Sequence, residues 1–152
     1  MKIWRIFVSA ALSAFLCTLP CYAALGGDVS SVQADQTRIN ASLRITQADA
    51  YSVHELRSPT GVVVREFAAP SGKVFAVAWH GPWPPDLQHL LGDYFAPFQQ
   101  ALQSPTRRAA HGPLFVQQGN LIVELGGHMR DFVGRAYLSD QLPTGVQAEE
   151  IH

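Results

Sequence analysis

Apolar and β-branched residues gather in three short segments in the middle of the chain. These segments cover residues 51–57, 62–68 and 73–79. They are separated by residues 58–61 (SPTG) and 70–72 (PSG), in which proline presets φ and glycine supplies positive φ. Short apolar runs joined by such turns predict an antiparallel meander of three strands.

The third segment, KVFAVAW, is apolar on both sides of the strand that it predicts. Because side chains alternate along a strand, Phe75, Val77 and Trp79 share one side, and smaller residues such as Ala76 and Ala78 share the other. A strand that is apolar on both sides is expected at the centre of its sheet. Its small side would let a helix approach closely.

The apolar spacing becomes helical after residues 84–86 (PPD). Apolar residues then fall at positions 87, 90, 91, 94, 95, 98 and 102. This spacing places them on one stripe, which predicts one main amphipathic helix over 86–103. Pro97 lacks a backbone donor and clashes with the preceding turn, so we expect a kink or break there, or the start of a second short helix.

Strand patterns return towards the C-terminus, over residues 113–118, 120–126 and 129–138. Gly119-Asn120 favours a tight turn between the first two of these strands. Gly134 indicates a bulge in the third.

The two ends of the expected domain have weaker patterns. Residues 28–40 predict a short, weakly amphipathic helix with Asp28 as its N-cap. Residues 139–152 predict a short C-terminal surface tail. Together the segments predict an α+β fold, an antiparallel sheet of about five or six strands (meander, helix, further strands) with the main helix packed on one face.

The N-terminus has the layout of a secretory signal peptide. Lys2 and Arg5 precede an apolar run, and the small residue Ala23 ends the stretch MKIWRIFVSAALSAFLCTLPCYA. We expect cleavage after Ala23, which leaves a single domain over 24–152 in the periplasm or outside the cell. The apolar run is shorter than the roughly 20 residues that a membrane helix needs, so no membrane span is expected in the mature form.

Removal of this leader changes the chemistry of the chain. Cys17 and Cys21 would both leave with it, so the mature form would have no thiol for a disulfide, a metal site or a nucleophile. Loss of Lys2 and Arg5 turns 11 basic and 12 acidic residues into 9 and 12, a formal charge of −3. No basic track for a phosphate backbone remains, so nucleic acid is not expected as a partner.

Catalytic and metal motifs are missing from the pattern. The six histidines lack a metal-ligand spacing such as HExxH, and there is no GxSxG elbow. Carboxylates such as Glu66, Asp86, Glu124 and Asp131 are scattered, so no acid–base pair can be chosen. We therefore expect no metal and no cofactor and assign no catalytic residue, while convergence of the histidines in space stays open.

The first candidate binding cluster is AWHGPWPPD, residues 78–86. Its glycine and prolines also fit a plain corner between a strand and a helix. Trp79 is expected in the core, whereas Trp83, held between prolines near His80 and Asp86, would suit stacking on a sugar or a proline-rich peptide.

The second candidate cluster is GGHMR, residues 126–130. Gly126-Gly127 favours a hairpin turn or a bulge, which would explain the cluster structurally. His128 and Arg130 would present hydrogen-bond donors to an anionic group.

Three long stretches resemble a known family. They are ALGGDVSSVQAD (24–35), HELRSPTGVVVREFAAPSGKVFAVAWHGPWPPDLQHLLGDYF (54–95) and GGHMRDFVGRAYLSDQLPTGV (126–146). In their order and spacing they are similar to the proteobacterial domain-of-unknown-function family 2844. The resemblance implies a short exported bacterial protein and brings neither an activity nor a residue role.

The function expected from these patterns is non-catalytic binding in the cell envelope. The partner would be another envelope protein, or a polysaccharide or peptide. The alternative is a small cysteine-free hydrolase acting on an envelope substrate.

Overall fold

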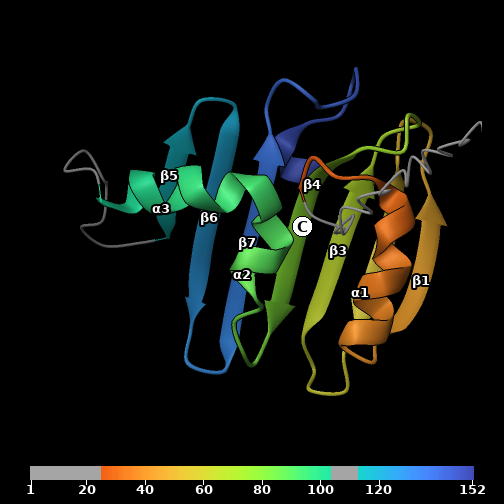
Figure 1. Cartoon of the computed structure of the whole chain (residues 1–152), viewed down its shortest axis with the longest axis horizontal. Helices are drawn as coiled ribbons and strands as arrows, with labels where there is room; N and C mark the ends of the chain where they lie inside the picture. The colour runs from red at the N-terminus through yellow and green to blue at the C-terminus, as the bar shows by residue number, and fades with distance from the viewer. Residues whose placement is uncertain (1–24, 104–112) are drawn as a thin grey trace, which may run out of the picture.

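A single antiparallel sheet of seven strands organises the fold, in the order β1-β2-β3-β4-β7-β6-β5 (Figure 1). The computed structural model describes residues 25–103 and 113–152. The strands are β1 (Ser42–Gln47), β2 (Ser52–Arg57), β3 (Val63–Ala68), β4 (Val74–Gly81), β5 (Leu114–Gln118), β6 (Leu121–His128) and β7 (Asp131–Leu138).

The α+β class is confirmed, but the expected count of five or six strands is too low. The strand that the pattern missed is β1, which lies at one edge of the sheet and is exposed at nearly every position. An edge strand with only Leu43 and Ile45 as large apolar residues has too weak an alternation to be recognised.

All helical elements that precede β5 lie together on one face of the sheet (Figure 1). They are η1 (Val29–Ser31), α1 (Val32–Arg38), α2 (Leu87–Leu91), η2 (Gly92–Tyr94) and α3 (Phe95–Gln103). The short N-terminal helix begins as expected, because the Asp28 side chain accepts a hydrogen bond from Ser30 N at 2.9 Å.

The main helical segment, residues 87–103, is interrupted at Gly92 and not at Pro97. Gly92 has a φ of +51°, a conformation that glycine adopts more readily than other residues, and the 3₁₀ turn η2 begins there. Pro97 lies in the first turn of α3, where its missing N–H needs no partner. The expected break therefore exists, but five residues earlier.

The helices pack on the large side of β4, and the expectation that a helix would use its small side is wrong. Ala68 pairs with Val74 and Phe67 with Ala76, so Phe75 is an extra, bulged residue. The bulge turns Phe75 to the side of Ala76, away from the helices. We call this second side of the sheet the open face.

Gly134 marks a close approach and not a bulge. β7 pairs with β4 and β6 without a register shift, and Gly134 lies opposite Trp79. A Cβ at position 134 would lie 2.4 Å from Trp79 Cζ2, so glycine makes room for the buried indole. The tight turn at Gly119-Asn120 is as expected, with a φ of +59° at Gly119.

The hairpin between β6 and β7 turns at Met129-Arg130, so the expected turn at Gly126-Gly127 is wrong. Arg130 adopts the positive φ of +66° that the turn requires, and both glycines remain within β6. A Cβ on Gly127 would lie 1.9 Å from Asp131 O, so the close approach of the two strands needs glycine there.

The last residues, 139–152, are not a simple surface tail. They include η3 (Ala148–Glu150), and Ile151 is fully buried in a cluster with Phe67, Phe75 and Tyr137 on the open face. The C-terminal segment therefore closes a second, smaller core.

Candidate functional site

Residues 78–86 form the corner between β4 and α2. β4 ends at Gly81, where a Cβ would lie 2.8 Å from the Cα of Val62, so only glycine fits. Asp86 caps α2 by accepting a hydrogen bond from His89 N at 3.1 Å. The prolines between these points restrict the backbone and hold the corner in shape.

The corner also forms the rim of a pocket of about 390 Å³, which we call the Trp83 pocket. The Trp83 side chain is 58 % exposed. The floor of the pocket is apolar, formed by Leu56, Val64 and Leu90. Polar groups stand around it, namely Asp35, Arg38, Ser58, Thr60 and Asp86. Trp83 and Asp86 are thus brought to one cavity.

Four largely buried polar side chains lie on the helix-covered side of the sheet, namely Asp35, which also lines the pocket, His54, Glu66 and His89. Asp35 is hydrogen-bonded to His89 Nε2, and Arg38 Nε lies 3.6 Å from Asp35 Oδ1. His54 lies directly opposite Glu66 in the pairing of β2 with β3, and its Nε2 is 3.1 Å from Ser52 Oγ.

Glu66 is fully buried, and neither of its carboxyl oxygens has a hydrogen-bond partner among the described residues. Burial, and secondly the negative charge of Asp35, raises the pKa of Glu66 to about 8. Burial likewise lowers the pKa of His54. Both groups are therefore held in their neutral forms at neutral pH, without a salt bridge.

The third candidate of the corner, His80, points to the open face. His80 Nε2 lies 2.8 Å from Asp131 Oδ1, and His128 Nε2 lies 3.5 Å from Asp131 Oδ2. Their side chains are 63 % and 79 % exposed. Two of the six histidines do converge, on a carboxylate that sequence reasoning left unassigned.

The candidate residues therefore divide between two faces. Trp83 and Asp86 line the Trp83 pocket, His80 and His128 meet on the open face, and Arg130 lies exposed in the turn beside them. Neighbours in sequence were separated because β4 ends between His80 and Trp83. The sequence did contain a signal for the contact of His128 with Asp131, because the residues that flank a two-residue hairpin turn pair directly.

Neither a metal centre nor a membrane helix is present in the described part of the chain. Within residues 25–103 and 113–152, no three or more His, Cys, Asp or Glu side chains are arranged to hold a metal ion. No helix in those same ranges is both long and apolar enough to cross a bilayer.

The fold and these surfaces define an α+β protein with one helix-covered antiparallel sheet and a pocket beside an exposed tryptophan. The chain belongs to the family described as a protein of unknown function, DUF2844, which it matches over residues 21–151. The family resemblance found in the three long stretches is thereby confirmed. No curated protein and no solved structure matches the chain.

Proposed function

We propose that this chain is an exported, non-catalytic binding domain that holds a polysaccharide of the cell envelope in the Trp83 pocket. The observation that supports this most is Trp83 itself, an indole 58 % exposed on a proline-restricted loop at the rim of a cavity. A large, rigidly held aromatic ring is suited to stacking on the apolar face of a sugar.

The polar groups of the pocket suit the edge of the same ligand. Asp86 accepts hydrogen bonds, Arg38 donates them, and the hydroxyls of Ser58 and Thr60 do either. A sugar ring stacked on Trp83 would turn its hydroxyl groups towards these side chains. An apolar floor below them favours partial desolvation of the bound ring.

The alternative function, a small hydrolase, is favoured only by the pair His80–Asp131, in which a carboxylate orients an imidazole. Both side chains are at least half exposed, at 63 % and 50 %. A general base so open to solvent gains little from its surroundings. The binding role therefore fits the geometry better.

Fluorescence tests the proposed ligand directly. The chain from residue 24 has two tryptophans, Trp79 at 4 % exposure and Trp83 at 58 %. Soluble glycan fragments of peptidoglycan should shift the fluorescence emission of Trp83 and protect it from quenching by iodide. Trp83→Phe should remove both effects. His128→Ala, on the open face, is the matched control and should leave them unchanged.

Three outcomes would reject parts of the proposal. A proline-rich decapeptide that protects Trp83 when glycans do not would make the ligand a peptide. Turnover of glycan lost in His80→Ala would make the protein an enzyme. Trp83→Ala costing as much stability as a core substitution would make the corner purely structural.

Export rests on residues 1–24, which lie outside the described residues. We propose that the mature chain begins at Ala24, because a charged start, a short apolar run and Ala23 precede it. N-terminal analysis of the secreted form tests this. Recovery of a chain that still carries Cys21, or of a lipid-linked form, would contradict it.

A further inference from the structure

The side chains of the open face form rows across the sheet, because neighbouring strands pair in a known register. The first row is apolar and contains Val53, Phe67, Ala76, Tyr137 and Ile122. The second is largely charged and contains Glu55, Arg65, Ala78, Arg135 and Glu124. The third contains Arg57, Val63, His80, Val133 and Gly126.

The C-terminal segment covers the first row. Ile151 is fully buried against Phe67, Phe75 and Tyr137. Leu142, Val146 and Ala148 pack against the same cluster, so a chain segment without regular strand pairing is held on this face by apolar contacts centred on Ile151.

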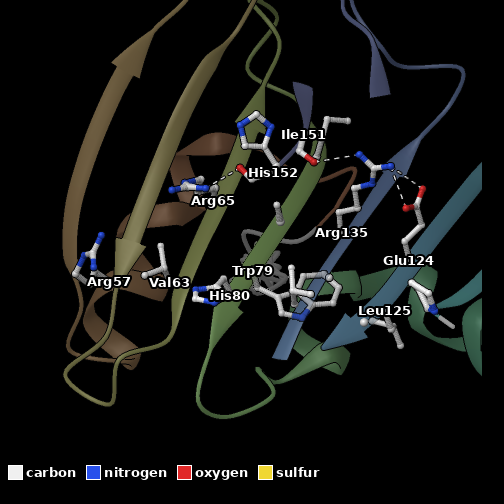
Figure 2. A pocket seen from close by; sticks show the side chains of 15 residues that line it. Arg57, Val63, Arg65, Trp79, His80, Glu124, Leu125, Arg135, Ile151 and His152 are labelled. Atoms are coloured by element: carbon white, nitrogen blue, oxygen red, sulfur yellow. Dashed lines mark hydrogen bonds and ion pairs between the residues drawn. The ribbon is translucent and has the colours of Figure 1, made fainter. Parts of the chain in front are cut away.

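The second row holds the main chain of that segment through two arginines (Figure 2). Arg135 Nη1 donates to Ala148 O at 2.7 Å, and Arg65 Nη1 donates to His152 O at 2.7 Å. Carboxylates on neighbouring strands orient both guanidinium groups. Arg135 Nη2 donates to both oxygens of Glu124 at 2.9 Å, and Arg65 Nε donates to Glu55 at 2.9 Å. These two hydrogen bonds go to main-chain oxygens and so do not depend on the side chains of the segment.

The third row is left uncovered and forms a groove of about 460 Å³, which we call the open-face groove. It begins beside Ile151 and His152 and extends to His80. Small residues in it, Ala78 and Gly126, leave it hollow. Val133 is 46 % exposed, although the open face of an antiparallel sheet is ordinarily polar. With the half-buried Val63 it gives the groove an apolar lining on a face where the neighbouring row is charged.

The charges around the groove are unequally matched. Arg65 and Arg135 each have a carboxylate at 2.9 Å, and His80 is held by Asp131. Among the described residues, Arg57 pairs only with Glu55, at 3.3 Å, which it shares with Arg65, and its side chain is 62 % exposed. Arg57 is thus the cation in the third row that is best placed to accept an added carboxylate.

We propose that the open-face groove binds an extended peptide segment of a partner protein, with an apolar side chain between Val63 and Val133 and an acidic one at Arg57. The groove continues directly from the site in which this chain holds its own C-terminal segment. The occupant would therefore lie beside that segment and use the same kinds of contact, an apolar anchor and arginine donors. This site is separate from the Trp83 pocket.

Selection of random seven-residue peptides displayed on phage tests the proposal, with the chain from residue 24 as the target. Peptides should be enriched that combine acidic and apolar residues. The binding of a synthetic copy should fall at least tenfold in Val133→Arg, which fills the groove, and in Arg57→Glu, which reverses its charge. Both positions are solvent-exposed, and thermal melting of each variant checks that it is folded.

Trp83→Ala is the matched control and should leave peptide binding unchanged, which separates this site from the glycan pocket. The proposal is overturned if no enriched peptide depends on Val133 and Arg57, or if the enriched peptides are basic. It is also overturned if the chain is a dimer that Val133→Arg dissociates, because the groove would then be occupied by a second copy.

Discussion

Two adjacent charged residues of β3 lie on opposite faces of the sheet and have opposite surroundings. Arg65, on the open face, is partly exposed and bonded to Glu55, whereas Glu66, on the helix-covered face, is fully buried and has no partner among the described residues. On the open face the charge of Arg65 is balanced by an ion pair, whereas on the covered face Glu66 is neutral because it keeps its proton. Paired surface charges contribute little to stability, but a buried unpaired carboxyl links stability to pH.

The difference extends to packing. On the covered face, α1, α2 and α3 enclose one continuous core, which extends in space from Val32 of α1 to Val123 of β6. On the open face, a smaller core depends on the C-terminal segment and on Ile151. We expect the first face to set global stability and the second to loosen locally, and the following experiments test that division.

The largest expected effect is the pH dependence due to Glu66. Its pKa is raised from 4.5 to about 8, so between these values the unfolded chain has lost a proton that the folded chain retains. Unfolding then releases a proton, and the free energy of unfolding falls as pH rises, by about 1.4 kcal/mol per pH unit. Urea denaturation from pH 5 to pH 8 should show this decline, which Glu66→Gln should remove.

Glu124→Gln is the control for this measurement, because Glu124 is a carboxyl paired with Arg135 on the open face. Burial of His54 acts in the opposite direction, since its lowered pKa costs stability as pH falls below its usual value. The comparison therefore uses the difference between wild type and Glu66→Gln. An identical pH slope in both would mean that Glu66 is ionised in the folded protein.

The next effect concerns the core of the covered face. Leu91 is a fully buried residue of the main helical segment, so Leu91→Ala should lower the free energy of unfolding by about 2 to 5 kcal/mol. Phe95→Ala, at a half-buried position on the same stripe, should cost less. Equal costs at the two positions in chemical denaturation would contradict this placement of the stripe.

Ile151→Ala should cost less than Leu91→Ala, about 1 to 2 kcal/mol of unfolding free energy, although both side chains are fully buried. The C-terminal segment can detach while the sheet remains folded, so its loss is limited by local unfolding. Backbone amides of residues 146–151 should therefore exchange their hydrogens faster than those of β4 under native conditions. A cost as large as that of Leu91→Ala, with uniform exchange, would show that both faces unfold together.

The smallest effect is expected at the Trp83 pocket. Trp83→Phe should change the free energy of unfolding by less than about 0.5 kcal/mol, because the side chain is exposed. Thermal melting measures this, with Trp79→Phe as the control. The control should be markedly destabilised, because Trp79 is buried against Gly134.

The candidate site was only partly accessible from the sequence. The proline-rich corner and the exposure of Trp83 followed from local chemistry, because proline and glycine restrict the backbone wherever they stand. The meeting of His80 with Asp131 did not, since it depends on the pairing of β4 with β7. The rows of the open face likewise required a register across five strands, for which the sequence carried no local signal.

The sequence by itself determined the α+β class, six of the seven strands and the main helical segment, because alternation, helical spacing and turn residues act over a few neighbours. Only the tertiary structure decided that β1 joins the sheet, that a bulge at Phe75 turns the small side of β4 away from the helices, and that Glu66 is buried beneath α1. These depend on which surfaces meet across long separations in the chain. A residue's surroundings, unlike its backbone preference, are set by partners that its own neighbourhood does not specify.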